Sequence, residues 1–183
     1  GECPPVQTVS VPFPFNFTLT ALSWSPDGSK AAFAYSDNPN GTPTKLFVFD
    51  PAASTWTALA EFPYIDPPFW SPDGTWIGFR TQNGFGGEDV YVVHRDGTEL
   101  KSISAGLPAD GRPYIMDGWY TENIIMRSAL PGNSGTHSVY LVRASDGFAR
   151  PMFETLLTKA QFTAASDASL LVYDEYDYTS QKH

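Results

Sequence analysis

Nucleophiles and bases that could form a hydrolase site are few and poorly spaced in this sequence. A serine hydrolase of the α/β type carries its serine in Gly-x-Ser-x-Gly, on a sharp turn between a strand and a helix, with a histidine as the base. The nearest string is Gly132-Asn133-Ser134-Gly135, which lacks that spacing, and His94, His137 and His183 are the candidate bases. The sequence therefore predicts no serine-hydrolase site.

Metal ligands are also scarce. A structural zinc site needs clustered Cys and His side chains, whereas this sequence has one cysteine, Cys3, and three separated histidines. The stretch Asp174-Glu175-Tyr176-Asp177 supplies carboxylates of the kind that calcium binds, without the glycine-containing loop of a calcium motif. We expect a solvated acidic tail there, with calcium binding left open, and no metal or other cofactor elsewhere.

Paired carboxylates could cleave glycosidic bonds, because such enzymes use two Asp or Glu side chains about 5 to 10 Å apart. The sequence does not show which carboxylates converge, so sugar cleavage stays an alternative, and we expect the chain not to be an enzyme. The pool consists of Glu61, Asp66, Glu88, Asp117, Glu122 and Glu154.

The composition favours many short strands over a helical bundle. Aromatic residues make up 15% of the 183 residues, and 16 prolines and 15 glycines suit tight turns between strands. The formal net charge of -9, without a Lys/Arg cluster, argues against a nucleic-acid partner. Apolar runs stay well short of the roughly 18 residues that cross a bilayer, so we expect no transmembrane segment.

A tryptophan-containing segment recurs along the chain. Leu22–Ser29 returns as Pro68–Thr75, and degenerate copies follow around Trp119 and Phe162. A repeat of about 45 residues is typical of one four-stranded propeller blade. Within Ser-Pro-Asp-Gly, Pro fixes φ, Asp bonds nearby amides and Gly takes the position that needs φ > 0, which predicts a tight turn. The residues assigned to this structural repeat, with the two tryptophans packing between adjacent blades, are Trp24, Pro26, Asp27, Gly28, Trp70, Pro72, Asp73 and Gly74.

The strand pattern within each repeat predicts an all-β fold, a β-propeller of four-stranded antiparallel blades. Three blades are complete and a fourth is partial, with limits at about 21–63, 64–105, 106–156 and 157–183. Residues 1–20 can supply a further strand. Two arrangements stay open. Either the N-terminal strand closes a four-bladed ring, or the chain is part of a larger propeller, with self-association through the incomplete fourth blade as one route to completion.

The segments Trp24–Gly28 and Trp70–Gly74 resemble the repeat of the TolB propeller family, one of the WD-repeat-like propellers. Related propellers also form half of prolyl-oligopeptidase-like peptidases. The resemblance spans roughly residues 22–173 and implies a secreted or periplasmic protein that docks proteins or peptides at the mouth of its channel. Members of the family usually have more blades than this chain supplies.

The linkers between blades and the loops between second and third strands share one side of a propeller, which we call the loop face. Functional residues are concentrated in loops on a rigid scaffold, and aromatic side chains and Arg dominate interface energetics. Capping of the blades is the alternative role for such residues. The candidate contacts on the loop face are Tyr64, Asp66, Phe85, Arg112, Tyr114 and Tyr176.

These observations predict a non-catalytic propeller that binds a protein or peptide through its loop face, in the periplasm or outside the cell. One alternative is a propeller that binds or cleaves carbohydrate, because an acidic, tyrosine-rich rim suits a basic peptide or a stacked sugar. The other alternative is the propeller half of a prolyl-oligopeptidase-like peptidase.

Overall fold

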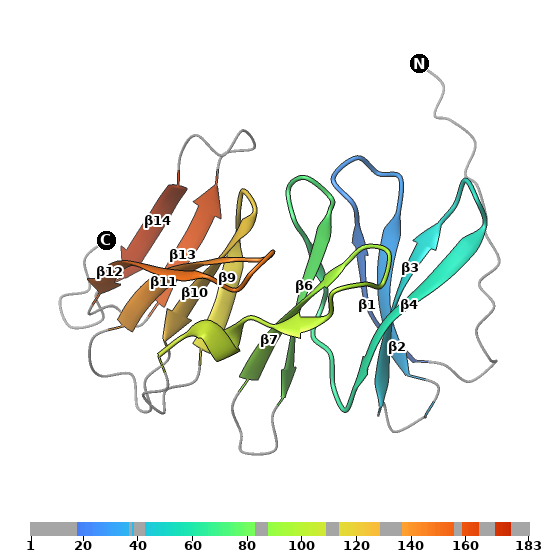
Figure 1. Ribbon diagram of the computed structural model, residues 1–183, viewed down its shortest axis with the longest axis horizontal. Coiled ribbons are helices and arrows are strands. Elements are labelled where there is room, and N and C mark those ends of the chain that lie inside the picture. Colours follow the sequence, from blue (N-terminus) through green and yellow to red (C-terminus); the bar gives the residue numbers. More distant parts are fainter. Residues whose placement is uncertain are drawn as a thin grey trace.

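The structure, a computed structural model, describes residues 18–36, 38, 43–82, 88–108, 114–128, 137–155, 159–164 and 171–176. These residues form four antiparallel sheets that stand side by side in a row (Figure 1). One turn of 3₁₀ helix, η1 (Ser104–Gly106), follows the second sheet.

The first two sheets are four-stranded, and each strand pairs with the next one along the chain. The first consists of β1 (Thr18–Trp24), β2 (Ala31–Ser36), β3 (Thr44–Asp50) and β4 (Thr55–Phe62). The second consists of β5 (Phe69–Trp70), β6 (Trp76–Gln82), β7 (Glu88–His94) and β8 (Lys101–Ser102).

The third sheet repeats this order, and the fourth contains two described strands. The third consists of β9 (Tyr114–Tyr120), β10 (Asn123–Ser128), β11 (His137–Arg143) and β12 (Ala149–Thr155). The fourth pairs β13 (Lys159–Ala164) with β14 (Leu171–Tyr176). The predicted all-β propeller fold, with three full four-stranded blades and a partial fourth, is confirmed.

Successive sheets contact one another: β1 lies against β5, and β9 lies against both β7 and β13. The first and fourth sheets stand at opposite ends of the row (Figure 1). Among the described residues the row is therefore open, which fits part of a larger propeller better than a closed four-bladed ring. Residues 1–17, the greater part of the segment expected to close that ring, lie outside the described residues.

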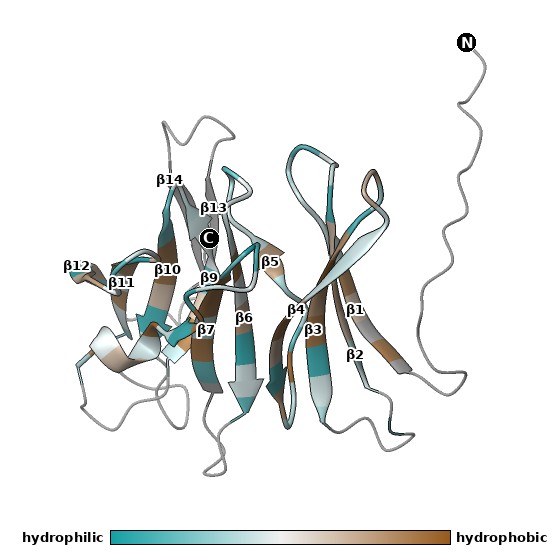
Figure 2. Ribbon diagram, turned by 45° about the vertical axis from the view of Figure 1, so that its right-hand side comes forward, coloured by the Kyte–Doolittle hydropathy of each residue, from teal (hydrophilic) through white to brown (hydrophobic). Residues whose placement is uncertain are grey.

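Apolar side chains fill the space between neighbouring sheets. Because strand side chains alternate between two faces, a blade inside the row offers one apolar face to each neighbour, and apolar and polar stretches alternate along the strands (Figure 2). The cluster between the first and second sheets includes Ala32, Ala34, Leu46 and Val48 from one side and Trp70, Ile77, Phe79 and Val93 from the other. The cluster between the second and third includes Val90, Val92 and Ile103 together with Ile124, Met126 and Val142.

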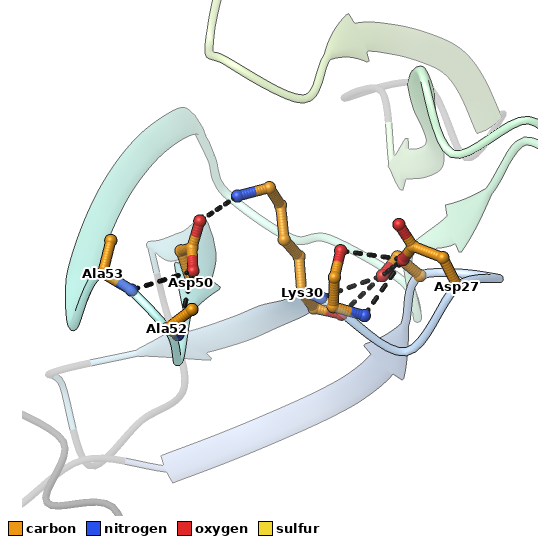
Figure 3. Close-up of polar contacts among 7 residues, drawn as sticks. Asp27, Lys30, Asp50, Ala52 and Ala53 are labelled. Atoms are coloured by element: carbon orange, nitrogen blue, oxygen red, sulfur yellow. Dashed lines mark hydrogen bonds and ion pairs between the residues drawn. The ribbon is translucent and has the colours of Figure 1, made fainter.

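The first intact repeat forms a turn organised by one carboxylate. The Ser25 hydroxyl and the Ser29 N–H both donate to Oδ1 of Asp27, at 2.7 and 3.0 Å. The residue after this turn, Lys30, forms an ion pair with Asp50 at the end of β3 (Figure 3). The turn is thus stabilised by hydrogen bonds within it and by an ion pair to the end of β3.

The second intact repeat has the same geometry. The Ser71 hydroxyl and the Thr75 N–H donate to Oδ1 of Asp73, at 2.6 and 3.0 Å. Gly28 and Gly74 hold equivalent positions with φ of 69° and 68°, a region that costs an L-residue with a side chain roughly 1–2 kcal/mol. Both copies of the motif thus supply the two groups that this turn requires, which are a glycine at positive φ and a carboxylate that accepts hydrogen bonds.

The turn at Asp27 predicts an acid-sensitive contribution to stability. Hydrogen bonds from Ser25 and Ser29 lower the pKa of the Asp27 carboxyl from 3.8 to about 2. Because the folded-state pKa is depressed, the contribution is present above about pH 4 and is lost as the pH falls toward 2. We expect the difference in unfolding free energy between wild type and Asp27→Asn, measured in urea, to shrink over that range. A difference that does not change with pH would show that the charge of Asp27 does not stabilise the turn.

No helix in the described part of the chain is long and apolar enough to span a bilayer.

Candidate functional site: a charged cluster on the loop face

Asp66 and Arg80 form an ion pair on the loop face of the second blade. Asp66 lies in the linker between β4 and β5, and its N–H donates to the carbonyl of Arg80 at 3.0 Å. The Arg80 guanidinium in turn lies 2.6 Å from the Asp66 carboxylate, and both side chains remain partly exposed. The backbone bond fixes the linker against β6, so the carboxylate is presented from a rigid position.

A second ion pair lies in the third blade. The Nε and Nη2 atoms of Arg127 on β10 donate to the two carboxylate oxygens of Asp117 on β9, at 3.0 and 3.1 Å. The pairing of β9 with β10 shifts register around Asp117, between Ile125 and Met126. Such a bulge re-aims a side chain, and here it accompanies a bidentate contact between two side chains that are only about one-tenth exposed.

The two ion pairs and a histidine influence one another electrostatically. Burial raises the pKa of the Asp117 carboxyl above 3.8, and the hydrogen bonds and charge of Arg127 act against this rise. The charges of Arg80 and His137 also lower the pKa of Asp117. Arg80 and His137 therefore lie near Asp117 and Arg127, and Asp66 is joined to this group through its ion pair with Arg80. We call these five residues the loop-face cluster.

His137 contributes a buried nitrogen to the loop-face cluster. The side chain is 4% exposed, and its Nδ1 lies 2.5 Å from the carbonyl oxygen of Ser128. A carbonyl only accepts hydrogen bonds, so Nδ1 carries a proton in this contact, and Nε2 is an acceptor whenever the ring is neutral. Among the described residues Nε2 has no hydrogen-bond partner. A buried acceptor of this kind can take a hydrogen bond or a proton from a ligand.

The loop-face cluster can recognise charge of both signs. Guanidinium groups bind carboxylates in a planar, bidentate manner, and the two Asp carboxylates can accept hydrogen bonds from amines or hydroxyls. In the part of the chain that the structure describes, no group of three or more His, Cys, Asp or Glu side chains is placed to hold a metal ion.

The predicted contact residues fall into three groups. Asp66 belongs to the loop-face cluster, and Tyr64, two residues earlier, is exposed. Tyr114 differs from the prediction: it is 6% exposed, and its hydroxyl donates to the carbonyl of Pro108 at 3.0 Å, so it belongs to the core between blades. Phe85 and Arg112 lie outside the described residues, and Tyr176 is placed only as the last residue of β14.

The carboxylates considered as a possible pair for sugar cleavage do not all lie at one site. Asp66 and Asp117 belong to the loop-face cluster, whereas Glu122 lines a cavity of about 370 Å³ with Asn123, Arg143 and Arg150. The cavity lies at the turn between β9 and β10, and in it Arg143 is paired with Asp146 at 3.1 Å. Neither acidic residue of the loop-face cluster lines this cavity.

Sequence reasoning missed Arg80 and Arg127 and considered His137 only as the base of a hydrolase. A signal was present, because Arg80 and Arg127 each stand inside an apolar strand, in Ile77–Thr81 and Ile124–Ser128. A charged residue in such a strand needs a partner. The carboxylates that supply it come from other segments, so the spacing along the chain could not identify them.

Several solved structures resemble the fold of this chain. No family model matches the sequence, and no curated protein matches it. An oligogalacturonate lyase in complex with manganese superposes with a TM-score of 0.73 at 15% identity, over 92% of this chain and 50% of that one. TolB from Acinetobacter baumannii superposes with a TM-score of 0.54 at 18% identity, over 85% and 37%. The β-propeller domain of the Trilobed protease from Pyrococcus furiosus, which has an open velcro topology, gives 0.55 at 18%, over 82% and 45%.

The fold of this chain is a β-propeller that resembles the propeller of TolB. The chain spans half, or less, of the length of the structures that it resembles. At such low identity the likeness shows the fold of this chain and not its activity.

The comparisons correct one expectation. The chain was predicted not to be an enzyme, because the sequence offers no recognisable catalytic motif, and the comparisons contradict that prediction. The propeller architecture matches a lyase and the propeller domain of a protease. A TolB-like fold therefore does not separate binding proteins from enzymes, and the function must be argued from the loop-face cluster itself.

Proposed function

We propose that this TolB-like propeller binds a protein or peptide segment on its loop face, outside the cytoplasm. The observation that carries the proposal is the partly exposed Asp66–Arg80 ion pair, held in a fixed linker beside the exposed Tyr64. Tyrosine is enriched among the residues that dominate binding energy, and the carboxylate near it can accept hydrogen bonds from a basic side chain. The surplus of acidic residues in the chain attracts such a segment from a distance.

A second ligand class is favoured by a separate observation. Nε2 of His137, which has no hydrogen-bond partner in the described part of the chain, offers a buried acceptor close to the Asp117–Arg127 pair. Hydroxyl donors and carboxylate groups occur together in acidic sugars, and the strongest structural match reported above is to an oligogalacturonate lyase. An acidic oligosaccharide is therefore the second candidate ligand.

One experiment separates the two ligand classes. The purified chain is presented to an array of basic peptides and, separately, to oligogalacturonate, and the affinities are measured by calorimetry at low and high salt. We expect a basic peptide to bind, with an affinity that falls as salt rises. Asp66→Asn should weaken that peptide by about tenfold or more, because a hydrogen bond to a charged group contributes about 1.5–3 kcal/mol.

The matched control is Asp146→Asn, which removes another Asp of an Arg ion pair at the opposite end of the third blade and should leave the affinity unchanged. Binding of oligogalacturonate that is lost in His137→Asn and kept in Asp66→Asn would establish the second ligand class instead. If Asp66→Asn and Asp146→Asn weaken the peptide equally, the loop face is not its binding site.

A further inference from the structure

The cavity of about 370 Å³ at the turn between β9 and β10, which we call the third-blade cavity, belongs to one face of the third blade. A row of cross-strand pairs contributes to it: Tyr120 pairs with Asn123, and Asn123 pairs with Arg143. Paired residues share a face, and neighbours along a strand point to opposite faces. Because Ile124 is buried in the cluster between the second and third blades, the row with Asn123 points the other way, toward the side where the fourth sheet stands (Figure 1).

The second blade has the same row with different residues. Trp76 pairs there with His94, and Lys101 pairs with Val92 on the same face. The indole of Trp76 packs edge to face on His94, and the Nζ atom of Lys101 lies 4.7 Å from the indole centroid. Trp76 is buried in the cluster toward the third blade. In the second blade this space is therefore filled by an indole that lies beneath a cation.

The third blade keeps the cation and has a much smaller residue beneath it. Register places Asn123 at the position of Trp76. It places Arg150 at the position of Lys101. An amide side chain does not fill the volume of an indole, so the third-blade cavity opens where the second blade has its ring. Among the described residues, the Arg150 guanidinium has no ion pair, hydrogen bond or aromatic ring as a partner.

The remaining walls of the third-blade cavity combine apolar surface with a second guanidinium. The guanidinium of Arg143 lies 5.6 Å from the ring centroid of Phe148, and its Nη1 donates to Asp146 at 3.1 Å, which uses one of its five N–H donors. Glu122 is the acidic residue of the lining, so two guanidinium groups face one carboxylate. This lining favours an anion that is attached to an apolar group. The apolar side chains of the lining are those of Tyr120, Leu141 and Phe148.

We propose that the third-blade cavity binds a small aromatic acid. The planar ring of the acid lies against Arg150, as the Trp76 indole lies against Lys101. Its carboxylate accepts hydrogen bonds from Arg143. A guanidinium over an aromatic face is a favourable cation–π contact, and hydrogen bonds between a guanidinium and a carboxylate are charge-assisted.

The size and place of the cavity limit the ligand and separate this site from the loop face. At about 370 Å³, the cavity is at the lower end of the roughly 300–1,000 Å³ range of small-molecule sites, so the ligand has one or two rings. No residue of the loop-face cluster lines the cavity. The inference therefore does not depend on the function proposed for the loop face.

The first test is calorimetric titration of the full chain with benzoate, cinnamate and naphthoate. Benzamide, which lacks the charge, and cyclohexanecarboxylate, which lacks the planar ring, should each bind at least about tenfold more weakly than the best aromatic acid. Arg150→Gln should weaken that acid about tenfold, because the cation over the ring is lost. The matched control is Arg95→Gln, which removes an exposed guanidinium from the corresponding turn of the second blade and should leave the affinity unchanged.

The second test gives the third blade the residue of the second. Asn123→Trp should abolish binding, because the indole takes the place of the ligand, and should raise Tm by about 2–4 °C through its contact with Arg150. Asn123→Ala, which keeps the cavity open, should retain binding. The inference is overturned if none of the three acids binds, or if benzamide or cyclohexanecarboxylate binds as tightly as they do. Binding that survives both Asn123→Trp and Arg150→Gln would place the ligand elsewhere and overturn it as well.

Discussion

Replacing Phe79 by alanine should lower the unfolding free energy by about 3–5 kcal/mol, the range for removal of a buried aromatic ring. Phe79 is fully buried between the first and second blades, and its ring centroid lies 5.5 Å from that of Phe62 and 5.8 Å from that of Tyr91. The cavity left behind would lie between two sheets, where both must move to fill it. Chemical unfolding in urea measures the loss, and the corresponding drop in Tm is about 10 °C.

The control for Phe79→Ala is Phe148→Ala, which removes the same side chain from an exposed turn beside Arg143. A surface substitution of this kind should change the unfolding free energy by no more than about 0.5 kcal/mol. A loss below about 1 kcal/mol for Phe79→Ala would mean that the first blade does not depend on its contact with the second.

Replacing Arg127 by methionine should be comparably destabilising, for an electrostatic reason. Removing one partner of a buried ion pair leaves an uncompensated charge and costs about 3–5 kcal/mol. Burial already raises the pKa of Asp117, and Arg127 is the main group that acts against this rise. In Arg127→Met the folded-state pKa of Asp117 should therefore lie further above the unfolded value of about 3.8. The measurement is urea unfolding of the variant and wild type at several pH values.

The sign of the pH dependence follows from linkage. With a raised pKa, the folded state of Arg127→Met binds a proton that the unfolded state releases, so its stability falls as the pH rises from about 4 through the raised pKa. The deficit relative to wild type should be largest at neutral pH and smaller near pH 5. The double variant Asp117→Asn/Arg127→Met should recover much of the neutral-pH loss. A deficit that is the same at every pH, and that the double variant retains, would assign the effect to lost packing.

The loop-face cluster was predictable only in part from the sequence. Asp66 was identified because it lies in an aromatic, proline-rich linker, and linkers of a propeller meet on one side. Tyr114 was assigned to the same surface by its position after a loop, but it begins β9, whose burial pattern places it in the core. His137 stands at the start of β11, and its contact with Ser128 depends on the antiparallel register of β10 and β11.

The sequence by itself determined the blade and its turns. Ser-Pro-Asp-Gly at Trp24 and at Trp70 contains, within a few residues, every group that its turn uses: the hydroxyl, the carboxylate and the glycine at positive φ. Because these interactions are local, the motif predicts the same geometry wherever it occurs, and the repeat then predicts the propeller.

Only the tertiary structure decided which side chains are buried between blades and which charged side chains form pairs. Trp24 and Trp70 have the same motif, yet one indole is exposed and the other is bonded to the preceding blade. Likewise, Arg127 pairs with Asp117, which lies at a bulge in β9, and Arg80 pairs with Asp66, which lies in the linker before β5. Burial and ion pairing depend on which surfaces meet in space, and that is set by the packing of whole sheets rather than by neighbours along the chain.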